Sequence, residues 1–193
     1  PGFTQWLDYV NSVLGGFGMH AGYKKIYVPM PDGSIKNYVI VIIGDSGHGK
    51  STLSFSDYGV ENIETLFGGD DMVALIPDNS DGFRVVGYET RGLYLKVYGI
   101  SETNEPFTYE GAMGSDVIFE NVPTDSKGMP RFDEESKNIL GTTNHRAIVP
   151  LRYFTRGLPP ALDVELDEKT DLMILLLTRA PEHPAIVMHE TPE

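Results

Sequence analysis

Residues 44–51 have the composition of a loop that binds phosphate. They fill the pattern G-x-x-x-x-G-K-[ST] with the letters GDSGHGKS. The glycines permit a tight curl in which successive backbone N–H groups point at phosphate oxygens, and a following helix turns its positive end toward the same anion. Lys50 is expected to reach the β- and γ-phosphates, and Ser51 to offer its hydroxyl to Mg²⁺. The pattern therefore predicts a site for a nucleoside triphosphate.

The expected contacts to this cofactor run through the loop into the first turn of the helix. They are Ser46, Gly47, His48, Gly49, Lys50, Ser51 and Thr52. His48 has two interpretations: its ring reads the bound phosphate or senses pH, or it faces solvent while its backbone N–H binds. The second is favoured, because backbone N–H groups do the binding in such loops.

Asp70 and Asp71 form a second feature that predicts chemistry. Phosphoryl transfer needs a carboxylate that holds a metal ion against the phosphates. Side chains of adjacent residues in an extended chain point to opposite sides, so one carboxylate can ligate the metal while the other orients a water or a cation. The alternative is an ordinary Asp-Asp turn, but the phosphate loop ahead of it favours the metal role.

Further motifs follow in a fixed order. They are Met19-His20, the extended loop GDSGHGKSTLS, Gly69-Asp70-Asp71, the segment GLYLK at 92–96 with Ser101 and Glu105-Pro106 after it, IFENV at 118–122, and NHRAIVP at 144–150. In these motifs the chain resembles the nucleotide-binding half of ATP-dependent phosphoenolpyruvate carboxykinase, from about Met19 to Pro150. The loop alone occurs in many proteins, whereas the ordered set is far more specific. His145 stands where that family has threonine.

The resemblance implies a metal site and a phosphoryl-transfer site. His20 and Asp71 would ligate a transition metal, usually Mn²⁺, and Ser51 would bind the Mg²⁺ of ATP. An imidazole, a carboxylate and phosphate oxygens suit a borderline ion such as Mn²⁺. A single histidine beside glycines is by itself more often a surface residue, so only the ordered set supports the assignment of His20.

Four catalytic residues are expected: the resemblance implies Lys50, Lys96 and Arg146, and the acidic pair adds Asp70. Lys50 and Lys96 would hold the transferring group, and Arg146 would face the γ-phosphate and the substrate oxyanion. This set suits a reaction whose catalysis is mostly positioning and charge neutralisation. Taken singly, each residue has a structural alternative: a lysine in a strand that extends to solvent for Lys96, and an ion pair with one of the many acids for Arg146. Only their joint order after the phosphate loop favours the catalytic roles.

The chain departs from the family in three places. The family's oxaloacetate-binding arginine and metal-binding lysine lie upstream of the Met-His segment, and no matching segment precedes Met19. The adenine-contacting segment lies downstream of residue 193. Met72 and Val73 replace acidic neighbours of the second Asp. The chain is therefore interpreted as a piece of a larger enzyme, or as a reduced relative with a different acceptor.

Three functions follow from these motifs. The resemblance implies that oxaloacetate and ATP become phosphoenolpyruvate, CO₂ and ADP, with a small molecule as the partner. The first alternative is a phosphate-loop kinase of the HPr kinase type that acts on a hydroxyl acceptor. The second is a nucleotide-binding domain without catalysis.

Two weaker candidates lie near the C-terminus. Arg179 follows an apolar strand, where ligands gather in α/β sheets, so it is a candidate for nucleotide contact. His183, His189 and Glu190 contain metal-ligating types, but a Pro-rich acidic stretch gives no support for a metal site there.

The elements that position these residues are mostly strands. A helix is expected over residues 3–14, a hairpin from strands 25–30 and 37–43, and further strands at 72–77, 83–90, 93–100, 116–119, 145–150 and 172–178, the last fully buried. Residues 78–82 are expected to turn, 124–137 to form a polar loop, and 158–169 an exposed excursion. The expected fold is mixed α/β and β-rich, with a twisted sheet and the loop between a central strand and a short helix. The expected parts are residues 1–18, 19–180 and 181–193.

Composition excludes several classes of protein. Fifteen Lys and Arg against 28 Asp and Glu give a net charge of -13, which repels nucleic acid and anionic lipid. No apolar run is long enough to cross a bilayer, so no membrane partner is expected. The absence of cysteine rules out disulfides and thiolate metal sites. We expect a cytoplasmic protein.

Overall fold

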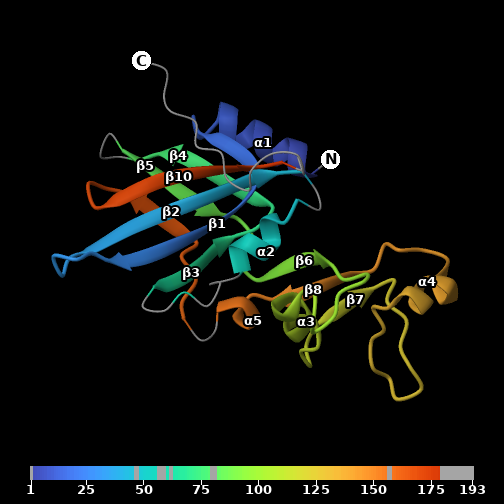
Figure 1. Cartoon of the computed structure of the whole chain (residues 1–193). Coiled ribbons are helices and arrows are strands. Elements are labelled where there is room, and N and C mark those ends of the chain that lie inside the picture. Colours follow the sequence, from blue (N-terminus) through green and yellow to red (C-terminus); the bar gives the residue numbers. More distant parts are fainter. Residues whose placement is uncertain are drawn as a thin grey trace.

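Two sheets carry the fold, and Figure 1 shows them in different parts of the molecule. The computed structural model describes residues 2–45, 48–55, 60, 63–78, 82–155 and 158–178. Within these ranges the larger sheet contains β1 (Phe17–Pro29), β2 (Ile35–Gly44), β3 (Glu64–Gly69), β4 (Met72–Pro77), β5 (Phe83–Gly87), β9 (Asp163–Leu166) and β10 (Thr170–Leu177). The smaller sheet contains β6 (Gly92–Lys96), β7 (Ile118–Glu120) and β8 (Arg146–Pro150). The expected mixed, β-rich α/β class is confirmed.

The described helices are short. They are α1 (Gly2–Ser12), α2 (Lys50–Phe55), α3 (Pro106–Ala112), α4 (Glu134–Leu140) and α5 (Arg152–Thr155). The predicted first helix is confirmed, and its Val10 is fully buried while the Trp6 ring meets Tyr88 edge-on at 5.1 Å. None of the described helices combines the length and apolar composition that crossing a bilayer requires.

The predicted hairpin is present as β1 and β2. The two strands pair antiparallel from Ala21 opposite Ile43 to Pro29 opposite Ile35. In the turn, the Asp32 side chain accepts a hydrogen bond from the backbone N–H of Ser34 at 2.9 Å, as aspartate does in tight turns. β1 begins earlier than expected, at Phe17, and this extension carries His20 into the sheet.

The long strand β1 is shared by two successive partners on one side. Its first four residues pair with β4, and residues 23–27 pair with β3. Strands β3 and β4 therefore lie end to end along β1, separated by Asp70 and Asp71. Asp71 has a φ of +63°, which breaks the extended chain at this corner.

Strand β10 runs parallel to β2, and Leu177 lies opposite Gly44. Both strands therefore end beside the start of the phosphate loop. The expectation of full burial is wrong, because Met173, Ile174 and Leu176 are 43%, 52% and 71% exposed. β10 is the edge strand of the sheet, and these three apolar side chains are exposed, while Leu172 packs against the buried core.

Two segments expected to lack regular structure contain elements. Residues 124–137 include the start of α4, which begins because the Asp133 side chain accepts a hydrogen bond from the Ser136 N–H at 2.9 Å. Residues 158–169 include β9, which pairs with β5 and buries Val164 between two outward acids. Most of the expected 78–82 turn and the segment 181–193 lie outside the described residues.

Helix α2 connects the larger sheet to the layer around the smaller one. The Phe55 ring stacks on Phe154 of α5 with centroids 4.4 Å apart and lies 5.5 Å from Phe67 of β3. Such aromatic pairs each contribute about 0.5–1.5 kcal/mol beyond their buried area. The other end of α2 is Lys50, so this packing fixes the orientation of the phosphate loop.

Candidate active site

The phosphate loop lies between the end of β2 at Gly44 and the start of α2 at Lys50. Gly49 has a φ of +92°, a conformation that side chains rarely allow, and the Leu53 N–H donates to its carbonyl to begin the helix. The His48 ring lies 3.2 Å from the Leu177 carbonyl oxygen, so it contacts the end of β10. Ser46 and Gly47 lie outside the described residues.

Lys50 folds back over its own loop. Its Nζ donates to the carbonyl oxygens of Gly44 at 2.8 Å and Asp45 at 3.4 Å, and the side chain is buried. A buried ammonium needs anionic or dipolar partners, and phosphate oxygens are stronger acceptors than these carbonyls. The residue is therefore placed to exchange carbonyl partners for a phosphate.

Asp70 lies under the start of α2 and contacts Ser51. The Ser51 hydroxyl donates to Asp70 Oδ2 at 2.8 Å, while Asp70 Oδ1 is buried and has no hydrogen-bond partner among the described residues. Burial raises the pKa of Asp70 to about 6; the Ser51 hydrogen bond and the charge of Lys50 oppose this shift, and Asp71 adds to it. An orphaned carboxylate oxygen suits a cation or an ordered water.

Glycine at position 22 is what allows this close approach. A Cβ there would lie 2.1 Å from Ser54 Oγ and 3.1 Å from Asp70 Oδ1. The absence of a side chain on β1 thus lets α2 and the carboxylate pack against the strand.

Asp71 faces a different partner from its neighbour, although the pair lies at a bend between β3 and β4 and not in an extended strand as the sequence prediction assumed. Its Oδ1 lies 2.7 Å from His20 Nε2, although the two residues are 51 positions apart. Both side chains are partly exposed, and the His20 ring meets Phe3 edge-on at 5.7 Å. In the described chain no three His, Asp or Glu side chains converge as a complete protein-only metal site. The pair therefore leaves most coordination positions of a metal ion to other ligands.

Lys96 and Arg146 come together on the smaller sheet. They are direct cross-strand partners in β6 and β8, on the face opposite the core formed by Leu93, Leu95 and Val149. The Arg146 guanidinium carbon lies 5.6 Å from the centre of the Tyr94 ring, and its Nε donates to Asn144 Oδ1 at 3.0 Å. His145, where the resembling family has threonine, is fully buried and meets Tyr98 edge-on.

Glu89 is a candidate that sequence reasoning missed. Burial, together with the charges of Asp70 and Asp71, raises the pKa of Glu89 to about 8, while a hydrogen bond with the backbone of Tyr94 opposes the shift. The Glu89 carboxyl group therefore lies within range of the charges of Asp70 and Asp71, and it also contacts the backbone of Tyr94 in β6. Glu89 falls inside the strand expected over residues 83–90, where a single glutamate carries no sequence signal of a functional role; in the structure it follows β5, which ends at Gly87.

Replacing Glu89 with glutamine is expected to stabilise the protein at alkaline pH. Above the ordinary carboxyl pKa of 4.5 the unfolded chain loses a proton that folded Glu89 keeps up to about pH 8. The free energy of unfolding therefore falls with rising pH, by about 1.4 kcal/mol per pH unit at most. The glutamine variant should be more stable by about 1–3 kcal/mol at pH 8 and unchanged at pH 4.5, measured by urea unfolding.

Glu102→Gln is the matched control for this prediction, because Glu102 is exposed. An equal gain of stability at pH 4.5 and pH 8 in Glu89→Gln would contradict the prediction, since it would show that ionisation of Glu89 is not the cause.

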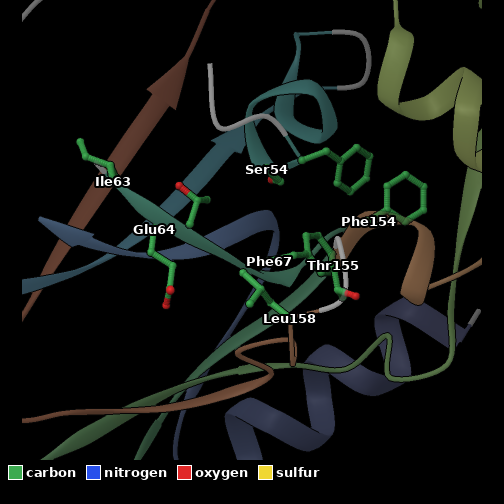
Figure 2. A pocket seen from close by; sticks show the side chains of 9 residues that line it. Ser54, Ile63, Glu64, Phe67, Phe154, Thr155 and Leu158 are labelled. Atoms are coloured by element: carbon green, nitrogen blue, oxygen red, sulfur yellow. The ribbon is translucent and has the colours of Figure 1, made fainter. Parts of the chain in front are cut away.

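Two cavities flank α2. Figure 2 shows one of about 170 Å³ between β3 and α5, lined by Ser54, Phe67 and Phe154 among others, and none of the predicted site residues lines it. The other, of about 140 Å³, is lined by Thr52 and by Glu105. Thr52 is thus a predicted cofactor contact that lines a cavity. Arg179, His183, His189 and Glu190 lie outside the described residues.

Comparison with known proteins finds similarity to one family over nearly the whole chain. A family model described as phosphoenolpyruvate carboxykinase matches residues 2–182. A curated relative from Aeropyrum pernix, named phosphoenolpyruvate carboxykinase (ATP), is 28% identical over 180 residues, which are 92% of this chain and 33% of that protein. A relative of the same name from Chelativorans sp. is 29% identical over 151 residues, 78% of this chain and 24% of that protein. The chain thus spans a third or less of the length of these relatives.

Proposed function

This chain belongs to the phosphoenolpyruvate carboxykinase family, and from that premise we propose that it is the part of such an enzyme that binds ATP phosphates and divalent metal ions. One observation carries the proposal. The adjacent carboxylates Asp70 and Asp71 each hold a partner from a distant segment, Ser51 at 2.8 Å and His20 at 2.7 Å. A phosphate-loop hydroxyl and an imidazole are thereby gathered at one corner of the sheet.

The donor atoms at this corner fit two divalent ions. Ser51 and Asp70 present hard oxygen atoms that suit Mg²⁺, and His20 with Asp71 suits a borderline ion such as Mn²⁺. The unpartnered Asp70 Oδ1 supports this fit, because it leaves a buried lone pair for a cation or its water. Bound ions of this kind neutralise charge on phosphate oxygens.

Three cations of the chain are proposed to hold the transferring group. Lys50 would leave its loop carbonyls for the β- and γ-phosphates, and Lys96 with Arg146 would present a positive row on the smaller sheet. Loss of CO₂ from oxaloacetate leaves an enolate, whose oxygen bonds to the γ-phosphorus as the bond to the β–γ bridging oxygen breaks and ADP leaves. Lys50, Lys96 and Arg146 would align and neutralise these charges.

The nucleoside part of ATP is proposed to occupy the cavity of about 140 Å³ beside α2. Thr52 lies one residue beyond the proposed Mg²⁺ ligand and lines this cavity, which supports a position near the proposed phosphate site. Glu105 also lines the cavity, and its carboxylate would be an acceptor for ribose hydroxyls.

Consumption of ATP that depends on oxaloacetate tests the proposal directly. With Mn²⁺ and Mg²⁺ present, the chain is expected to release ADP and phosphoenolpyruvate when oxaloacetate is added. ATP binding without turnover would overturn the carboxykinase activity for this chain and leave the non-catalytic domain. Transfer to a hydroxyl acceptor with no dependence on oxaloacetate would favour the HPr kinase type.

A further inference from the structure

The residue pair Glu120-Asn121, at the end of β7, touches both groups that hold Arg146. Glu120 accepts a hydrogen bond from the Tyr94 hydroxyl, and Tyr94 is the residue whose ring faces the guanidinium. Asn121 Nδ2 donates to the Asn144 carbonyl at 3.3 Å, and Asn144 accepts from Arg146 Nε. Adjacent residues thus each support one side of Arg146.

The register of the smaller sheet makes this arrangement. Arg146 lies on the central strand, with Lys96 and Glu120 as its direct neighbours on either side. A glutamate directly opposite an arginine normally forms an ion pair across strands. Here, in the part of the chain that the structure describes, Glu120 binds the Tyr94 hydroxyl and forms no ion pair with Arg146.

The contacts of Arg146 leave its two terminal amino groups available to a ligand. Asn144 Oδ1 accepts a hydrogen bond from Arg146 Nε, and the guanidinium carbon lies 5.6 Å from the centre of the Tyr94 ring. Among the described residues no further hydrogen bond engages the two terminal amino groups of Arg146. These are the groups that bind a phosphoryl oxygen pair in the bidentate manner typical of arginine.

We propose that Glu120 and Asn121 are positioning residues, which act through Tyr94 and Asn144 to hold Arg146 ready for the γ-phosphate. This rests on the proposed function of Arg146. Holding a long side chain in one conformation before binding removes part of the entropy loss that binding otherwise carries. Engaging Glu120 with a hydroxyl also keeps that carboxylate from neutralising the arginine.

Tyr94→Phe tests the second effect, because it keeps the ring and releases Glu120. The freed carboxylate is expected to pair with Arg146, so affinity for Mg-ATP should fall roughly fivefold, while affinity for ADP, which lacks the γ-phosphate, changes less than about twofold. Adding Glu120→Gln to Tyr94→Phe should restore ATP affinity to within about twofold of the parent protein. A merely structural role of Tyr94 predicts no such rescue.

Asn121→Gly tests the support that Asn121 gives to Arg146 through Asn144. Asn121 has a φ of +55°, which glycine also adopts, so the variant removes the amide and keeps the backbone. A roughly threefold loss of ATP affinity with ADP affinity unchanged is expected.

Tyr98→Phe is the matched control, because Tyr98 donates a similar hydrogen bond to Glu134, which does not contact Arg146 among the described residues, and phenylalanine keeps the ring that meets His145. Its affinities should equal those of the parent protein. Arg146→Ala, measured in parallel, separates the two proposals. If Arg146→Ala leaves ATP affinity unchanged, the proposed function of Arg146 fails. If Arg146→Ala weakens ATP binding but Tyr94→Phe does not, or Glu120→Gln gives no rescue, the positioning role is overturned.

Discussion

Replacing Lys50 with alanine is expected to abolish ATP binding, with a loss of at least about 100-fold in affinity measured by calorimetry with Mg-ATP. Lys50 is buried and is the cation that reaches the centre of the loop, where it donates to the Gly44 and Asp45 carbonyls. Without it, those carbonyl oxygens and the incoming phosphates face each other with no positive charge between them. The chain's net charge of -13 offers no long-range attraction to compensate.

The same substitution is expected to raise the pKa of Asp70 further above about 6, because the charge of Lys50 currently lowers it. Lys127→Ala is the matched control, since Lys127 is an exposed lysine in a turn. Its ATP affinity should equal that of the parent protein. Unchanged ATP affinity in Lys50→Ala, with the fold intact by circular dichroism, would remove the basis for a phosphate loop here.

The second large effect is expected on binding of Mn²⁺. His20→Ala or Asp71→Asn should each weaken Mn²⁺ binding about 10- to 100-fold, measured by the electron paramagnetic resonance signal of free Mn²⁺. The reason is geometric: the two side chains approach to 2.7 Å, so one imidazole and one carboxylate would be available to the same proposed ion. Each remaining partner alone is a single weak ligand.

Because the proposal assigns the two side chains to one ion, the double variant is expected to lose little more affinity than either single variant. Asp125→Asn is a matched control, as Asp125 is an exposed aspartate in a turn within residues 124–130. Binding of two Mn²⁺ ions per chain, with each single variant losing a different one, would indicate two independent sites and contradict a shared ion.

Features determined within a few consecutive residues could be predicted without the fold. The hairpin turn follows from Asp32 and Gly33, because an aspartate side chain and a glycine with positive φ satisfy a tight turn locally. The strand 72–77 was predicted with its observed bounds from apolar residues alone. By contrast, β9 was missed because its burial depends on β5, a partner about 80 residues earlier. The burial of 172–178 was overestimated because an apolar segment does not say whether another layer covers it.

The available chemistry can be recognised in the amino-acid sequence: a glycine-rich loop ending in Lys50 and Ser51, an acidic pair, and the ordered motifs of the family. A loop of eight residues is a local structure, so its pattern is visible in a short window. The folded chain was needed to show that His20 meets Asp71, that Lys96 lies opposite Arg146, and that Glu89 is buried within range of the charges of Asp70 and Asp71. Those contacts depend on strand register and sheet order, and long-range pairing of this kind leaves no mark in any single segment.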